Sequence, residues 1–434
     1  MGDQQVRFQR PHPHARRAPT MTDTAPAYQS DLLRLLSERG HIHQITDAAA
    51  LDALAAKEVV TAYVGFDPTA ASLHVGNLAS IMLLRRIQQA GHRPIVIMGG
   101  GTAKVGDPSG KDDVRKMLTD AQLKGNIGSI QGSFEKILRF DSSPSGALLI
   151  DNDDWLSKLG YIELLRDVGP HFTLNRMLTF DSVRLRLDRE QPLTFLEFNY
   201  MILQAYDFLQ LARDHGCRLQ LGGSDQWGNI VNGIELGRRI DGAELYGVTA
   251  PLITTADGKK MGKSVAGAVW LNEDMLPSFD FWQYWRNVDD RDVARFLRLF
   301  TDVPLDEIAR LETLEGAEVN AAKILLANEV TALVRGRAAA ETAAATGSAT
   351  FAGGGLGTDL PVIDVPEGGI GLIDALVTAG FAASRGEAKR LIAGGGARID
   401  GVVVNDDAHR ISAQAQDTRL SAGKKKHAVL RGVD

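Results

Sequence analysis

The chain has 434 residues, of which 24% are charged and 44% belong to the hydrophobic set. This balance is typical of a soluble globular protein, and the length predicts two or three domains. No apolar run approaches the length that a membrane-spanning helix needs, so no segment is expected to span a bilayer. The lone cysteine, Cys217, excludes an internal disulfide framework and fits a reducing compartment, so a cytoplasmic location is expected.

The formal net charge of −6 argues against binding of nucleic acid by the whole surface. Residues 369–434, however, carry ten Lys or Arg and seven Asp or Glu, so this segment is basic and the rest of the chain is acidic. A basic segment on an acidic body indicates a local contact with a polyanion. For the lysine run at 424–426, a solvated surface is an equally reasonable explanation.

Residues 1–27 are polar, basic and contain proline, and they lack the apolar core of a secretory signal. We expect them to form a disordered leader, in which Met21 is an alternative start.

Between residues 59 and 253, short apolar runs alternate with segments of helical period. Strands are expected at 59–65, 94–98, 147–151, 218–221 and 247–253, and helices at about 73–90 and 194–215. The alternation predicts an α/β catalytic domain built on a Rossmann-like, doubly wound parallel sheet with helices on both faces. Ligands bind beyond the carboxyl ends of the strands in such sheets, and the polar motifs of this chain fall there.

The second half of the chain is mostly helical. Segments 289–299, 305–314 and 318–345 predict an α-helical domain, and the glycine-rich segment after them predicts a linker. Residues 371–407 show two short helical patterns and an alternation at 397–404 that is typical of a hairpin. The expected boundaries are 28–275 for the catalytic domain, 276–345 for the helical domain, 346–368 for the linker and 369–434 for a small α+β domain.

Two distant motifs carry histidine and lysine. The first, at 68–77, ends in His74 and Asn77, which are three residues apart and therefore share one face of the predicted helix. Free amides at the start of a helix favour phosphate, and Gly76 would let an adenine ring approach closely.

The second motif, at 258–264, places Lys260 and Lys263 in a glycine-flanked loop. Two lysines can neutralise the charge that grows as pyrophosphate leaves ATP, so protein groups supply position and fixed charge rather than a nucleophile. Each motif alone is explained by a helix cap or by solvated lysines. Their joint occurrence on an α/β background favours a site that activates a carboxylate with ATP.

The two motifs resemble the HIGH and KMSKS signatures of class I aminoacyl-tRNA synthetases. The segments 63–69, 106–111, 200–208 and 220–229 are similar to those of bacterial tyrosyl-tRNA synthetases, and the resemblance extends from about residue 28 to the C-terminus. Two positions depart from the signatures, because Asn77 replaces a histidine and Gly262 replaces a serine. An asparagine amide can still donate to a phosphate, and the glycine is expected to loosen the loop without removing chemistry.

Tyr200, Gln204 and Asp207 follow one another at i, i+4 and i+7 on the helix predicted at 194–215. A stripe of these residues is a poor core face, because burying unpaired polar groups costs free energy. It suits a ligand with one charged and one neutral polar end, and tyrosine is such a ligand.

The resemblance implies roles for individual residues. The phenol of the substrate is expected to meet Tyr63 and Asp207, and its ammonium group Asp107, Tyr200 and Gln204, with Thr102, Asn152 and Gln220 completing the pocket. The ATP side is expected to comprise Gly65, Asp67, Thr69, His74, Gly76, Asn77, Gly223, Asp225, Gln226, Lys260 and Lys263, with Asp225 placed for the ribose hydroxyls. The expected catalytic residues are His74, Asn77, Lys260, Lys263 and Ser264.

The implied activity joins L-tyrosine to ATP with release of pyrophosphate and transfers the tyrosyl group to the terminal adenosine of tRNA(Tyr). Phenylalanine would leave buried polar groups of the pocket unpaired, and tyrosyl-tRNA synthetases are the standard example of such rejection. No cysteine or histidine cluster has metal-ligand spacing, so Mg²⁺ is expected with ATP and no protein-bound metal is predicted. The resemblance also implies a homodimer bridged by tRNA.

Segments 384–392 and 395–401 resemble an S4 RNA-binding module. Arg385, Lys389 and Arg390 can lie on one side of a short helix and donate to phosphates of structured RNA. A basic helix is more often only a solvated surface. Its position after a synthetase-like core in the chain favours RNA binding.

Two alternatives stay open on the residues. A tryptophanyl-tRNA synthetase has a similar core, although an indole has one donor and no acceptor and would poorly suit Asp207 with Tyr63. A catalytically idle S4-type RNA-binding protein is disfavoured by the intact His74, Asp225, Lys260 and Lys263.

Overall fold

The computed structural model describes residues 28–107, 118–258, 261–264, 267–352, 360–414, 417–423 and 426–433. The predicted leader and Lys260 lie outside these ranges. The predicted domain boundaries stay predictions, and the elements are given below as the structure has them.

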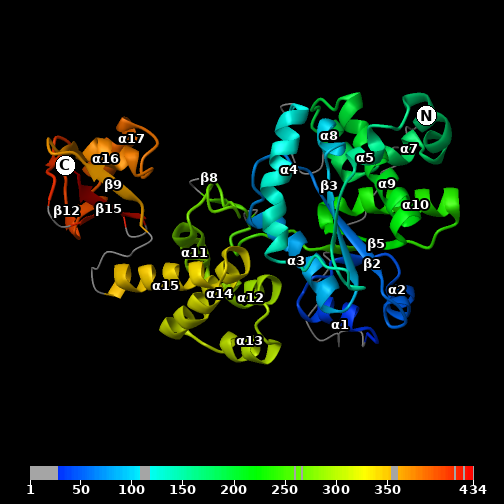
Figure 1. The fold of residues 1–434 in the computed structure, drawn as a ribbon, viewed down its shortest axis with the longest axis horizontal. Helices are drawn as coiled ribbons and strands as arrows, with labels where there is room; N and C mark the ends of the chain where they lie inside the picture. Colours follow the sequence, from blue (N-terminus) through cyan, green and yellow to red (C-terminus); the bar gives the residue numbers. More distant parts are fainter. Residues whose placement is uncertain are drawn as a thin grey trace, which may run out of the picture.

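A six-stranded sheet in the order β1-β6-β5-β2-β3-β4 forms the centre of the N-terminal part (Figure 1). The strands are β1 (Gln44–Ile45), β2 (Thr61–Phe66), β3 (Arg93–Met98), β4 (Leu148–Asp151), β5 (Cys217–Gly223) and β6 (Tyr246–Ala250). The five strands β2 to β6 are parallel, whereas β1 pairs antiparallel with β6. The parallel sheet was predicted, but its short antiparallel edge was not.

Side chains of β2 alternate between two helices that cover opposite faces of the sheet. Val64 and Phe66 belong to the core that contains α3 (Val75–Gln89), while Tyr63 packs edge-on against Phe208 of α9 (Phe195–His215) with ring centroids 5.2 Å apart. This alternation follows from the period of two along a strand. It confirms the predicted cover of both faces.

Helix α9 is delimited by its own sequence. Thr194 accepts from the Glu197 amide at 3.2 Å and donates its amide to the Glu197 carboxylate at 3.1 Å, and Gly216 ends the helix with φ 59°. The other helices of this part are α1 (Asp31–Glu38), α2 (Ala48–Ala55), α4 (Asp120–Glu135), α5 (Asp153–Leu156), α6 (Tyr161–Glu163), α7 (Leu174–Met177), α8 (Asp181–Asp188) and α10 (Trp227–Asp241), with short turns at Thr102–Lys104, Leu164–Val168, Gly169–His171 and Ser224–Gln226.

Five helices follow the sheet: α11 (Ser278–Arg286), α12 (Val293–Phe300), α13 (Leu305–Glu312), α14 (Val319–Arg335) and α15 (Arg337–Ala352). The segment 318–345 is helical, as predicted, but it contains parts of two helices, because Gly336 has φ 97° and separates α14 from α15. Helix α11 was not predicted, although its Trp285 packs at the centre of an aromatic group with Phe281, Phe296 and Phe300.

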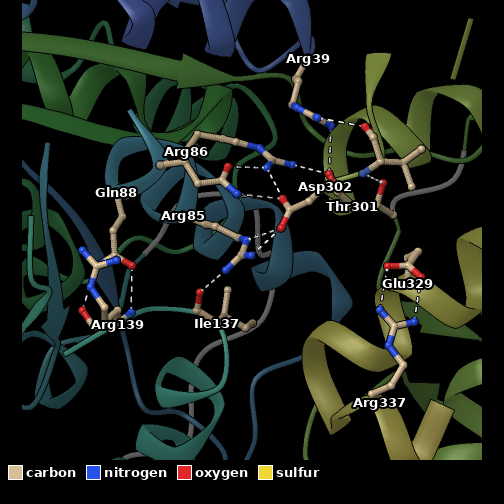
Figure 2. Close-up of polar contacts among 12 residues, drawn as sticks. Arg39, Arg85, Arg86, Gln88, Ile137, Arg139, Thr301, Asp302, Glu329 and Arg337 are labelled. Carbon is tan, nitrogen blue, oxygen red and sulfur yellow. Dashed lines mark hydrogen bonds and ion pairs between the residues drawn. The ribbon is translucent and has the colours of Figure 1, made fainter. Parts of the chain in front are cut away.

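Three arginines connect the helical part to the sheet part through hydrogen bonds and ion pairs (Figure 2). Arg85 and Arg86, near the end of α3, bind the carboxylate of Asp302, which follows α12. Arg86, 1% exposed, and Arg39 both donate to the Thr301 carbonyl, at 2.6 and 3.0 Å. Burial alone would raise the pKa of Asp302, but Arg85 and Arg86 outweigh it and hold that pKa well below its usual range. We call these five residues the Asp302 cluster.

The C-terminal part has a separate core of its own. Its five-stranded sheet has the order β12-β11-β14-β15-β9 and carries the helices α16 (Leu372–Thr378) and α17 (Arg385–Ala393). The strands are β9 (Val362–Val365), β11 (Ala397–Ile399), β12 (Val402–Val403), β14 (Thr418–Ala422) and β15 (Lys426–Gly432), with β10 (Ile370–Gly371) and β13 (Arg410–Ile411) as a separate pair. The predicted α+β class and the hairpin β11–β12 are confirmed.

Cys217 is fully buried at the start of β5, where its thiol donates to the Thr61 carbonyl at 3.4 Å. Burial raises the pKa of this thiol to about 12. No helix in the described ranges is both long and apolar enough to cross a membrane.

Candidate active site

The first motif turns from the carboxyl end of β2 into α3. His74 stands at the N-cap, and its amide donates to Oδ1 of Asn77 at 3.1 Å. The oxygen of the asparagine is thereby directed to its own helix start, which leaves the side-chain NH₂ as the group that can donate to a phosphate. The expected contact of Asn77 with a phosphate stays a prediction.

The second motif lies directly on the first. The amide of Val75 donates to the Val269 carbonyl at 2.9 Å, and the Val269 amide donates to the Gly262 carbonyl at 3.1 Å. Gly262 has φ 105°, and a Cβ there would lie 3.1 Å from the amide nitrogen of Gly76. Gly262 is therefore required for close packing of the two motifs, in addition to any freedom it gives the loop.

Gly76 of the first motif likewise allows the two motifs to pack closely. A Cβ on it would lie 2.8 Å from Cε1 of His74 and 3.4 Å from the Met261 carbonyl. Close approach of an adenine ring to Gly76 stays a prediction. Lys263 and Ser264 form β7 (Lys263–Ser264), which pairs with β8 (Gly267–Ala268), and Lys260 lies outside the described residues.

A buried carboxylate lies at the base of the predicted amino-acid pocket. Asp207 is 3% exposed and accepts from Nδ2 of Asn152 at 2.9 Å and from Nε1 of Trp155 at 2.8 Å. Burial outweighs these two donors and, with the charges of Asp67 and Asp151, raises the pKa of Asp207 to about 8. Trp155 had not been predicted, because nothing in its local sequence indicates a partner 52 residues further along the chain.

Tyr63 and Gln220 face the same region from neighbouring strands. They are register partners in β2 and β5, so their side chains leave the same face of the sheet. The Tyr63 hydroxyl and the Gln220 side-chain oxygen are buried and have no hydrogen-bond partner within the described part of the chain. Burial first, and then the nearby Asp207, raises the pKa of Tyr63 well above its ordinary value. Such groups suit a polar ligand, because leaving them unpaired costs free energy.

Asp67, which follows β2, connects the end of this strand to the turn at Thr102 and to Tyr200 of α9. It accepts from the Thr102 hydroxyl at 2.8 Å and from the Tyr200 hydroxyl at 3.1 Å, and Asn152 donates to the same Thr102 hydroxyl at 3.0 Å. A Cβ on Gly99 would lie 2.1 Å from a carboxylate oxygen of Asp67, so only glycine fits there. The glycine run at 99–101, directly after β3, is the feature of the sequence that indicates this close approach.

Gln204 and Gln226 form a second polar group with Asp107. Gln204 donates to Gln226 at 3.2 Å, Gln226 donates to Asp107 at 3.0 Å, and Asn229 donates to both glutamines at 3.0 and 3.1 Å. Gln226 was expected on the adenosine side, but its side chain lies with the residues expected around the ammonium group. Asn229 was not predicted.

The remaining ATP-side residues follow the carboxyl ends of two adjacent parallel strands. Gly65, Asp67 and Thr69 lie at the end of β2, while Gly223 ends β5 and Asp225 lies in the turn after it. The structure therefore brings together the described members of the predicted set at one edge of the sheet.

The predicted RNA-binding residues lie on α17 of the C-terminal part. Arg385 pairs with Asp374, and Lys389 pairs with Asp407 at 3.1 Å. All four side chains are about half exposed, and exposed ion pairs of this kind are weak enough to open for another anion. In the described ranges, no three Cys, His, Asp or Glu side chains form a metal site.

Comparisons with known proteins agree with this geometry. The family described as tRNA synthetases class I (W and Y) matches residues 55–352, and the S4 domain family matches residues 371–417. The tyrosine–tRNA ligase of Novosphingobium aromaticivorans is 68% identical over 93% of this chain and 99% of that protein, and the one of Zymomonas mobilis subsp. mobilis is 62% identical over the same shares.

Solved structures give the same result. The C-terminally truncated mitochondrial tyrosyl-tRNA synthetase of Coccidioides posadasii is 34% identical, with a TM-score of 0.62 over 73% of this chain and 91% of that chain. The corresponding enzyme of Aspergillus nidulans is 29% identical, with a TM-score of 0.67 over 74% of this chain and 94% of that chain. This chain therefore belongs to the class I tRNA synthetases of the tryptophan and tyrosine group and, within it, to the tyrosine–tRNA ligases.

Proposed function

We propose that the chain activates L-tyrosine with ATP to tyrosyl-adenylate and transfers the tyrosyl group to the 3′-terminal adenosine of tRNA(Tyr). The observation that carries the proposal is the buried Asp207, which two neutral donors hold beside the buried Tyr63 hydroxyl. A phenol donates to the carboxylate and accepts from a tyrosine hydroxyl, whereas an indole can do only the first.

The other end of the amino acid is an ammonium group, and the two carboxylates nearest Tyr200, those of Asp67 and Asp107, suit it. Asp67, Asp107 and Asp207 all raise the pKa of the Tyr200 hydroxyl through their charges, after burial, which places Tyr200 in a field of negative potential. Asp107, Tyr200 and Gln204 receive the ammonium group in this proposal. Thr102, Asn152 and Gln220 line and orient the pocket.

The chemical step needs no protein nucleophile. An oxygen of the tyrosine carboxylate attacks the α-phosphorus, the bond from that phosphorus to the bridging oxygen breaks, and pyrophosphate leaves with Mg²⁺ that arrived bound to ATP. His74, the Asn77 amide and the first amides of α3 meet the phosphates, and Lys260, Lys263 and Ser264 stabilise the growing charge on pyrophosphate. Asp225 and the glycines of β2 and β5 hold the adenosine.

The RNA contact is assigned to α17. Arg385, Lys389 and Arg390 exchange their surface partners for phosphates of tRNA. We place the protein in the cytoplasm, since a reduced, buried Cys217 suits a reducing compartment.

We also propose a homodimer that uses the face formed by residues 161–196. Nine of the 17 large apolar side chains that are exposed in the described ranges fall in this stretch, including Ile162 at 72% and Phe195 at 68%. An apolar concentration of this kind on one segment marks a protein interface. A second copy is the occupant we assign, because the face continues into α9, whose other side forms the tyrosine pocket.

Pyrophosphate exchange into ATP, measured with each amino acid in turn, tests the activity. We expect exchange with tyrosine and not with tryptophan or phenylalanine, and exchange driven by tryptophan alone would overturn the assignment. Light scattering tests the dimer: Phe195→Glu should give monomers, while Val402→Glu, an equally exposed position on β12, should not. A wild-type monomer would refute the interface.

A further inference from the structure

The start of α12 holds the polypeptide that leads into the second motif. Oδ2 of Asp292 accepts from the Ala256 amide at 2.7 Å, and Oδ1 accepts from Nη2 of Arg295 at 2.6 Å. Arg295 also donates to the Thr254 carbonyl. Asp292 is 3% exposed, and an acid is buried this far only where such contacts compensate for the loss of water.

The residues held in this way connect directly to the first motif. The amide of Met261 donates to the Ile253 carbonyl at 2.9 Å. This bond brings Met261 of the second motif next to the residues that Asp292 and Arg295 hold. Gly262, the next residue, packs on the backbone of Gly76. The contacts of Asp292 and Arg295 therefore hold residues 254 and 256 next to the point where Met261 meets Ile253 and Gly262 packs on α3.

The opposite end of α12 is fixed to α3 itself. Thr301 and Asp302 follow α12 and belong to the Asp302 cluster, in which Arg85 and Arg86 come from the last turns of α3 (Figure 2). Helix α12 is thus hydrogen-bonded at its start to residues 254 and 256, which precede the second motif. At its end it is bonded to α3, the helix that begins with the first motif. The two motifs share a common support.

A further contact secures the other flank. Arg335 of α14 donates to the carbonyls of Trp270 and Leu276 at 3.1 and 2.9 Å. Trp270 forms a bridge with His74, and Leu271 donates its amide to the Leu73 carbonyl at 2.8 Å. Helices outside the sheet therefore hold the second motif on both sides.

We propose that Asp292 and Arg295 are positioning residues for ATP, which set the second motif at its working distance from His74 without touching substrate. The proposal rests on the proposed function. Neither residue contacts the tyrosine pocket, so their loss should impair the use of ATP and leave recognition of tyrosine intact.

Steady-state pyrophosphate exchange by the full chain tests this proposal. For Asp292→Ala we expect kcat/KM for ATP to fall roughly 10- to 100-fold, because a small misplacement of a charged group is costly in such reactions. The KM for tyrosine should stay within about twofold of wild type. Asp292→Asn keeps an oxygen for the Ala256 amide and should recover part of the loss.

Arg298→Met is the matched control, because Arg298 lies on the same helix and, among the residues that the structure describes, its side chain pairs only with Glu312. Equal losses in Asp292→Ala and Arg298→Met, or equal changes in KM for tyrosine and ATP, would overturn the proposal. If Asp292→Ala does not fold, Arg295→Met carries the same test, since methionine still covers Phe296. A wild-type protein without tyrosine-dependent exchange would instead refute the proposed function.

Discussion

Two aspartates of this protein meet opposite environments. Asp207 is buried among neutral donors, Asn152 and Trp155, and its pKa rises to about 8. Asp302, whose side chain is 39% exposed, is bound by Arg85 and Arg86, and its pKa falls. Neutral donors satisfy the geometry of a carboxylate but not its charge, whereas arginines satisfy both.

The difference separates a recognition site from a structural contact. A carboxylate kept without a cation retains the capacity to bind a further donor, such as a phenol or an ammonium group. A carboxylate already paired with two arginines has little left to offer a ligand and instead joins two parts of the chain. The following experiments test this division.

Replacement of Asp207 should give the largest effect. Asp207→Asn keeps the size of the side chain but replaces an acceptor oxygen with an NH₂ beside the donors Asn152 and Trp155. The kcat/KM for tyrosine should therefore fall roughly 100-fold, which corresponds to about 3 kcal/mol. Pyrophosphate exchange measures the loss, and discrimination against phenylalanine should shrink with it. Unchanged discrimination would place Asp207 with the structural contacts.

Replacement of Asp302 should affect stability instead. Asp302→Ala leaves Arg86 buried without its carboxylate, and the free energy of unfolding should fall by about 2 kcal/mol, a value reduced for the partial exposure of Asp302. Urea unfolding followed by tryptophan fluorescence measures the change. The KM for tyrosine should not move, and a rise comparable to that of Asp207→Asn would break the comparison.

Removal of one neutral donor should give a smaller effect. Trp155→Phe deletes the hydrogen bond to Asp207 while keeping an aromatic ring, and tyrosine binding should weaken by about 1 kcal/mol, or roughly fivefold. The control is Trp285→Phe, in the aromatic group of the helical part, which should leave tyrosine binding unchanged. Equal effects of the two substitutions on binding would show that Trp155 acts only through stability.

The two aspartates also predict a difference in the shape of the pH profile. The raised pKa of Asp207 means that its contribution to stability is complete below the unfolded pKa of about 4 and is lost as pH rises through about 8. The lowered pKa of Asp302 means that its contribution is complete above about pH 4 and is lost in acid. Unfolding at several pH values should show that the loss between about pH 4 and pH 8 is absent from Asp207→Asn and that the loss below about pH 4 is absent from Asp302→Asn.

Local sequence was sufficient where one element sets its own structure. The apolar runs predicted the parallel strands to within a few residues, and Thr194 and Gly216 delimit α9 as capping residues do. It was insufficient where a single residue overrides a pattern, as Gly336 does between α14 and α15. The two residues of β1 are too short a run to carry a signal.

In the site, the resemblance supplied the residues but not their connections. Asp67, Thr102 and Tyr200 come from three elements, and their hydrogen bonds depend on how those elements pack. The same is true of Gln226, which bonds to Asp107 rather than lying apart from it. Packing on Gly76 also explains Gly262 better than loop freedom does, and only the tertiary structure shows that contact.

Cys217 gives this chain a built-in chemical reporter. Its thiol is the only one in the sequence, and it is buried in the core that α9 forms with the sheet, where burial raises its pKa to about 12. An alkylating reagent can therefore modify the chain only when this core opens. The rate of alkylation therefore reports how often the core around Cys217 opens. A ligand that binds the folded chain should slow this rate.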